Sequence, residues 1–116
     1  MLNQTVLVGR IVKDPEVKEL ESGKSVTNLT LAIPRSYKNE NGEYDTDFVD
    51  CTLWNSIAQN VCEYCHKGDI VGVKGRIQTE NYEVDGDKRK HTTIVAEKVT
   101  FLSSSKSKEK EDEMEV

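Results

Sequence analysis

The chain has 116 residues, a formal net charge of −5 and three cysteines. This length fits one ordinary domain that buries its own core, and an odd number of cysteines argues against a full disulfide framework. The sequence shows neither a long apolar run nor a secretion signal, which argues against membrane-spanning and exported classes, so we expect a cytoplasmic protein with reduced thiols.

The first predicted element is a strand over residues 5–12, which are mostly apolar and β-branched. Gly9 inside this stretch predicts a bulge or a sharp bend. Asp14-Pro15 ends the strand, and residues 17–20 are predicted to add a short edge before the turn at residues 21–24.

A hairpin is predicted to join the second and third strands. The second strand covers residues 25–33, and Pro34 is predicted to end the regular pairing or to mark an edge. Asn41-Gly42 is the strongest short hairpin signal that a sequence offers. The third strand then follows at residues 46–54.

This third strand has two unlike faces, because successive side chains of a strand point to opposite sides. One face is a plausible core side, made of Val49, Cys51 and Leu53. The other mixes a carboxylate and a hydroxyl with two large rings: Phe48, Asp50, Thr52 and Trp54. Two interpretations stay open for this second face. It is either a second core beneath a helix or a subunit, or a platform on which unpaired bases stack at about 1–3 kcal/mol each.

After Trp54 the spacing of the apolar residues changes from the alternation of a strand to the spacing of a helical face, so residues 55–66 predict a helix. Its buried stripe is expected to hold Ile57, Val61, Tyr64 and Cys65. Asn55 or Ser56 is predicted to cap its start, and Gly68 to adopt the left-handed conformation that follows a helix.

Two more strands are predicted at residues 69–79 and 92–102, joined through a hairpin turn at Asp85-Gly86. A phase shift between Ala96 and Val99 predicts a bulge. The side chains expected to face inward are Val71, Val73, Gly75 and Ile77 in the first strand, and Ile94, Ala96, Val99 and Phe101 in the second. Three strands, one helix and two strands is the order of the OB-fold. The predicted class is therefore all-β, a five-stranded Greek-key barrel with one helix between its third and fourth strands.

The predicted domain covers residues 1–102. Residues 103–116, SSSKSKEKEDEMEV, lack a core-forming pattern and predict a disordered acidic tail.

The cysteines offer a motif that competes with a binding role. Cys62-Glu63-Tyr64-Cys65-His66 matches the attachment pattern of c-type haem, and adding Cys51 would give four zinc ligands. However, the motif lies within the predicted helix and Cys51 faces the predicted core, so small buried hydrophobes explain the three thiols best. We expect no cofactor, no metal site and no catalytic residues, since no catalytic constellation accompanies the two histidines.

Four aromatic residues fall on outward positions or in loops: Tyr37, Phe48, Trp54 and Tyr82. Basic side chains accompany them, namely Arg10, Arg35, Lys38, Lys67, Lys74, Arg76 and the run Lys88, Arg89 and Lys90. Interleaved rings and cations suit a nucleic-acid single strand. The net acidic charge counts against this interpretation, but only the contacting face needs to be positive.

Taken together, these stretches resemble the single-stranded DNA-binding proteins of bacteria and phages. The resemblance is carried by VLVGRIVKDPEV at 6–17, TLAIPRSY at 30–37, DFVDCTLWNSIAQNVCEYCHKG at 47–68, GRIQTENYEVDG at 75–86 and VTFL at 99–102. It implies a protein that coats and protects single strands during DNA replication, recombination and repair. An alternative is an OB-fold protein-interaction subunit of a replication or primosome assembly that uses the same aromatic face.

The resemblance also implies site residues and partners. Base-stacking positions in the family match Tyr37, Phe48, Trp54 and Tyr82, and basic positions match Arg10, Arg35, Lys67 and Arg76, whereas Ser56 and Glu80 depart from the pattern. A homotetramer, or a dimer, built through the first strand is implied. The family recruits replication and repair enzymes through an acidic tail with a Pro-Phe tip, but this chain ends in EKEDEMEV without that tip and so resembles a short-tailed member.

Overall fold

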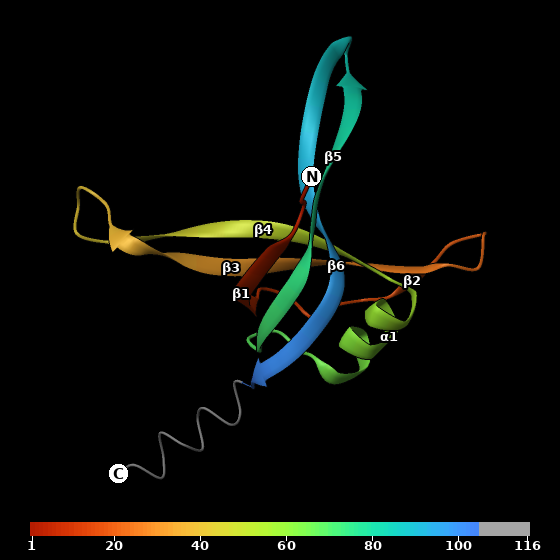
Figure 1. The fold of residues 1–116 in the computed structure, drawn as a ribbon, viewed down its shortest axis with the longest axis horizontal. Coiled ribbons are helices and arrows are strands. Elements are labelled where there is room, and N and C mark those ends of the chain that lie inside the picture. Colours follow the sequence, from red (N-terminus) through yellow and green to blue (C-terminus); the bar gives the residue numbers. More distant parts are fainter. Residues whose placement is uncertain (105–116) are drawn as a thin grey trace.

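The computed structural model describes residues 1–104, so the predicted tail from residue 105 onward lies outside the described part. Seven elements follow one another in the chain (Figure 1): β1 (Thr5–Ile11), β2 (Lys18–Glu19), β3 (Ser25–Lys38), β4 (Tyr44–Trp54), α1 (Asn55–Tyr64), β5 (Ile70–Val84) and β6 (Asp87–Ser103). Within residues 1–104, no helix is long and apolar enough to cross a membrane.

Five of the strands close into a barrel. Their order is β1-β5-β6-β4-β3, and a further pairing of β1 with β3 closes the ring. All pairs are antiparallel except β4 with β6, and the two-residue β2 only extends the edge of β3. This closed five-stranded barrel with one helix confirms the predicted OB-fold.

The core fills the barrel and continues under the helix. Alternate residues of each strand point inward and are fully buried, including Leu29, Leu31, Cys51, Leu53, Val71 and Val73. The helix α1 packs on β3, β4 and β6 and adds Ala58 and Val61 to the same cluster. The inward face predicted for residues 49–53 is therefore confirmed, although Val49 is only partly buried.

Two hairpins extend beyond the barrel as arms that point in different directions (Figure 1). The β3–β4 arm turns at Asn41-Gly42, where the Asn39 side-chain oxygen accepts hydrogen bonds from the N–H groups of Asn41 and Glu43. The β5–β6 arm turns at Asp85-Gly86, and both residues have positive φ, as a type I′ turn requires. Both predicted hairpins are confirmed. The strands of the second arm are longer than predicted, because pairing continues from Thr79 to the turn.

Gly9 does not form the predicted bulge, since the pairing of β1 with β5 is continuous from Thr5 to Arg10. A Cβ at Gly9 would lie 2.8 Å from Ile33 Cγ1 and 3.0 Å from Leu31 Cβ. Glycine is therefore required because β1 passes close to β3 where the barrel closes.

Pro34 does not end its strand either. It pairs with Thr46, and β3 continues to Lys38 with an irregular register after Pro34. The predicted loss of regular pairing at this proline is thus correct, but the arm continues past it.

The helix differs from its prediction at both ends. It ends at Tyr64, so this ring is 67% exposed and not part of the buried stripe. No side chain caps its first turn. Asn55 instead has a positive φ, and its side-chain oxygen accepts a hydrogen bond from the Ser25 N–H at 3.3 Å. Gly68 has the predicted positive φ but lies in the following loop, where its N–H donates to the Ile11 carbonyl.

The predicted bulge in the last strand is confirmed, because Lys74 pairs with Lys98 whereas Gly75 pairs with Ala96. Two residues expected to face inward are half-exposed: Ile77, on the arm beyond the barrel, and Phe101, beside a second register shift near the end of β6. Strand parity places a side chain on one side of a sheet, but only the opposite wall of the barrel buries it.

We predict that Gly75→Ala lowers the free energy of unfolding by about 1–3 kcal/mol or prevents folding, because overpacking has this cost and the obstacle here is backbone. A Cβ at Gly75 would collide with the Val95 carbonyl oxygen at the bulge. Gly72→Ala on the same strand is the matched control, since its Cβ would meet the nearest atom, Leu102 Cδ1, at 3.7 Å. Denaturant unfolding of both variants tests this, and equal stabilities would contradict it.

Candidate functional site

The outward face of β4 presents rings that the barrel does not cover. Phe48 is 67% exposed and Trp54 is 37% exposed, with Asp50 and Thr52 between them. The neighbouring strand β3 places the small or polar residues Ala32, Thr30 and Asn28 opposite Phe48, Asp50 and Thr52. Phe48 belongs neither to the buried core nor to the residues packed against it, so no second core within residues 1–104 covers this ring. The interpretations that remain for this face are a subunit that lies over it and a platform for unpaired bases. We call the outward face of β3 and β4 from Phe48 to Trp54 the aromatic face.

The other two predicted rings do not lie on the aromatic face. Tyr37 is exposed near the end of β3, within the irregular stretch between Pro34 and Lys38. Tyr82 is half-exposed on the β5–β6 arm, opposite Arg89. Because the two arms point in different directions (Figure 1), a ligand that reaches all four rings has to bend across the barrel.

Tyr44 belongs with these rings, although the sequence analysis left it out. It is exposed at the start of β4, and the Lys38 ammonium lies 5.8 Å from its ring centroid. The signal for it was available, because Tyr44 lies four residues before Phe48 and so has the same strand parity. It was missed because β4 begins at residue 44 and not at the expected residue 46.

Two of the predicted cations are already engaged within the chain. The Arg35 guanidinium donates to both carboxylate oxygens of Asp47, at 3.0–3.3 Å, and lies 3.8 Å from Asp45. This hydrogen bonding lowers the pKa of Asp47 and raises the pKa of Arg35. Arg10 donates to the Gly68 carbonyl oxygen at 2.6 Å. The charge of Arg35 is therefore partly neutralised by Asp47, and the side chain of Arg10 is fixed in place by its hydrogen bond.

The remaining predicted cations are exposed but dispersed. Lys67 follows the helix, Lys74 and Arg76 lie on β5 and Lys88 and Arg89 lie on the β5–β6 arm. Arg76 donates to the Gln78 side-chain oxygen at 3.2 Å. The structure thus does not bring the predicted rings and cations into a single cluster.

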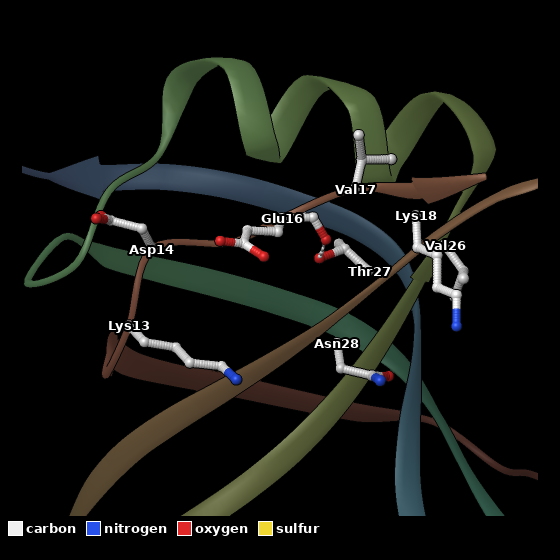
Figure 2. A pocket seen from close by; sticks show the side chains of 8 residues that line it. All are labelled: Lys13, Asp14, Glu16, Val17, Lys18, Val26, Thr27 and Asn28. Atoms are coloured by element: carbon white, nitrogen blue, oxygen red, sulfur yellow. Dashed lines mark hydrogen bonds between the residues drawn. The ribbon is translucent and has the colours of Figure 1, made fainter.

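An open groove of about 500 Å³ continues from the Trp54 end of the aromatic face (Figure 2). It lies beside β3, where Val26 pairs with Trp54 and Asn28 pairs with Thr52. Lys13 and Lys18 line this groove, together with Asp14 and Glu16. The sequence analysis did not select these lysines, and no sequence signal distinguished them from other surface charges.

A carboxylate stands in the middle of the aromatic face. Thr30 Oγ1 donates to Asp50 Oδ1 at 2.9 Å, and His91 Nε2 lies 3.6 Å from Asp50 Oδ2. Thr30 is directly opposite on β3 and orients the carboxylate by its hydrogen bond, whereas His91 comes from β6 and lies beside it. The pairing with His91 joins residues far apart in the sequence and could not be read from the local pattern.

Two of the three cysteines are core residues. Cys51 and Cys65 are buried and Cys62 is partly buried. Burial raises the pKa of the Cys51 thiol to about 11 and also raises that of Cys65. Among residues 1–104, no group of three or more His, Cys, Asp or Glu side chains could hold a metal ion.

We predict that the folded protein at about pH 7.5 takes up one equivalent of a maleimide promptly, at Cys62, because a buried thiol with a raised pKa is inert. All three cysteines should react in denaturant. Mass spectrometry of labelled protein measures this, and Cys62→Ser should abolish the fast phase. Prompt labelling of Cys51 in the folded state would contradict the prediction.

The geometry defines a class of protein: a closed OB-fold barrel with an uncovered aromatic sheet face. The family model described as "Single-strand binding protein family" matches residues 2–102, and the chain belongs to this family.

Curated relatives agree with this assignment. The chain is 46% identical over 103 residues to single-stranded DNA-binding protein B of Bacillus subtilis, covering 88% of this chain and 91% of the relative. It is 46% identical over 108 residues to single-stranded DNA-binding protein 3 of Listeria innocua, covering 92% and 68% of the two chains. It is 40% identical over 111 residues to the single-stranded DNA-binding protein of Lactiplantibacillus plantarum, covering 95% and 56%. The chain thus spans between about half and nine-tenths of the length of these relatives.

Proposed function

We propose that this protein binds single-stranded DNA without strong dependence on sequence and protects it during replication, recombination and repair. The observation that carries the proposal is the exposure of two rings on one strand face, 67% for Phe48 and 37% for Trp54. Rings on a polar sheet face stack on unpaired bases, and every base offers a flat surface to stack on. Bases in a duplex already stack on one another, so this surface selects single strands.

The family and its relatives support the same role. The three relatives described above all carry names of single-stranded DNA-binding proteins. The alternative, a protein-interaction subunit using the same face, is therefore not favoured. The proposed role is binding and not catalysis, and it is a cytoplasmic one, because that is where replication exposes single strands.

In the proposed complex the bases lie on β4 while cations at its margins contact phosphates. Phe48 and Trp54 are six residues apart, about 20 Å along a strand, which leaves room for several bases. The predicted contacts are Tyr37 and Tyr82 for bases, and Arg10, Arg35, Lys67, Lys74, Arg76, Lys88 and Arg89 for phosphates. Because Arg35 is paired with Asp47 and the net charge is −5, few phosphate contacts are expected, and the salt dependence should be correspondingly modest.

The proposal is tested by titrating the protein with oligo-dT and with duplex DNA. Trp54 is the only tryptophan, so stacking on it should quench the intrinsic fluorescence. Quenching is expected with oligo-dT and not with the duplex. Equal binding of both would overturn the proposal.

We predict that Trp54→Ala and Phe48→Ala each weaken the binding of labelled oligo-dT by about 1–3 kcal/mol, because each removes a stacking surface. Both variants should keep cooperative unfolding, because neither ring belongs to the buried core. Anisotropy of the labelled DNA measures the affinities. Tyr64→Ala is the matched control, since this ring is 67% exposed but lies on α1. The affinity of this variant for oligo-dT should equal that of the wild type. If Trp54→Ala abolished cooperative folding, Trp54 would be a core residue.

We also propose that the chain forms a homotetramer, or a dimer, through the outer face of β1. Val6 is 69% exposed and Val8 is half-exposed, and Leu102 lies next to Gly72, the pairing partner of Val8. Contiguous exposed apolar side chains mark protein–protein contacts. An apolar hollow beside Val8, lined also by Ala32, Pro34 and Ile70, supports a contact on this side of the barrel.

We predict that Val6→Asp combined with Val8→Asp dissociates the oligomer, because burying two carboxylates in the interface without positively charged partners is too costly. Light scattering after gel filtration measures the mass. Val84→Asp on the β5–β6 arm is the control and should leave the mass unchanged. This side chain is equally apolar, but it lies next to the hairpin turn, far from the stretch Ile70–Gly75 of β5 that pairs with β1. A wild-type monomer would contradict the proposed oligomer.

A further inference from the structure

The aromatic face contains a carboxylate at a position where a polyanion is proposed to bind. The Asp50 side chain is 49% exposed and lies on β4 two residues from Phe48 and four from Trp54. Coulomb repulsion between this carboxylate and a phosphate weakens any binding mode that places the backbone here. The bases must therefore cover Asp50, with the phosphates directed away from it.

Asp50 is held by a hydrogen bond from β3 and lies beside a histidine of β6. Thr30 Oγ1 donates to Oδ1 at 2.9 Å, and His91 Nε2 lies 3.6 Å from Oδ2. An ionised carboxylate has about four acceptor sites on its two oxygens. Thr30 occupies one site on Oδ1, so acceptor capacity is left on the exposed part of the group for a base that lies over it.

The four bases differ in what they offer to a group that only accepts hydrogen bonds. The Watson–Crick edge of guanine presents two neighbouring donors, N1–H and the N2 amino group, which match the two oxygens of one carboxylate. Adenine and cytosine present one amino donor beside a ring nitrogen that accepts, and thymine presents one N–H between two carbonyl oxygens. Single-stranded bases are commonly read on this edge, and paired donors on a carboxylate give the stronger and more selective contact.

We propose that Asp50 is a specificity-determining residue that gives guanine a preferred position beside Phe48. Two residues along a strand span about 7 Å, so a base stacked on Phe48 extends its edge toward the carboxylate. The inference rests on the proposed function and adds to it: sequence-independent stacking is accompanied by one position that favours guanine.

The test compares three labelled oligonucleotides at constant pH and salt: oligo-dT, oligo-dT with single dG residues at regular intervals, and the same DNA with dI in place of dG. Inosine keeps N1–H and O6 but lacks the N2 amino group. The wild type should bind the dG oligonucleotide at least about fivefold more tightly than the dI oligonucleotide, the lower end for one paired base contact.

Asp50→Asn removes the second acceptor and the charge at nearly constant volume. It should bring the ratio of dG to dI affinities to about one while leaving oligo-dT binding intact or tighter. Glu63→Gln is the matched control, since it removes an exposed carboxylate from α1, and it should keep the preference.

The outcomes separate the two proposals. If the wild type binds oligo-dT but does not distinguish dG from dI, the guanine preference is refuted and the proposed function stands. The guanine preference is also refuted if Asp50→Asn tightens the binding of all three DNAs equally and keeps the ratio of dG to dI affinities, because Asp50 would then only repel phosphates. If oligo-dT does not bind at all, the proposed function itself fails. Should Asp50→Asn not fold, the wild-type comparison of dG with dI decides alone.

Discussion

The closure of the barrel by the pairing of β1 with β3 is the constraint on which the rest of the structure depends. Closing a small barrel brings β1 so close to β3 that Gly9 has no room for a Cβ. Once the ring is closed, each strand has one side toward the core and one side outside it. Cys51 and Leu53 fill the inside, and the rings of Phe48 and Trp54 are left on the outside, opposite Ala32 and Val26 of β3. The binding surface is thus a direct consequence of barrel geometry.

The two arms are continuations of barrel strands, but their side chains are not enclosed by a barrel. Beyond the barrel, β3–β4 and β5–β6 are two-stranded hairpins with no opposite wall, so side chains on both of their faces are exposed. This explains why Ile77, which has inward parity, is half-exposed, and why Tyr37, Tyr44 and Tyr82 are accessible. A DNA strand that contacts these rings and the aromatic face must follow a curved path around one small domain.

In the proposed complex, stacking carries more of the binding than phosphate attraction does. Arg35 is paired with Asp47, and Asp50 stands among the rings, held by Thr30 and close to His91. A protein whose net charge is negative gains little from long-range attraction to DNA, so contacts to the bases themselves must supply affinity. The carboxylate that disfavours phosphates at the centre of this face is the group that we propose discriminates between bases.

The sequence alone determined the features that depend on neighbouring residues. Alternation in residues 46–54 separated Phe48 and Trp54 from Cys51 and Leu53, the Asn-Gly and Asp-Gly pairs placed both hairpin turns, and the order of elements indicated an OB-fold. The tertiary structure decided what depends on distant segments. The need for glycine at position 9 arises from β3, and the exposure of Tyr64 from where the helix stops. The exposure of Ile77 arises from its place on the β5–β6 arm, and that of Phe101 from the register shift near the end of β6. The contact of Asp50 with His91 joins β4 to β6, and no local pattern encodes it, because side-chain alternation reports the face a residue occupies but not which residue of another strand lies beside it.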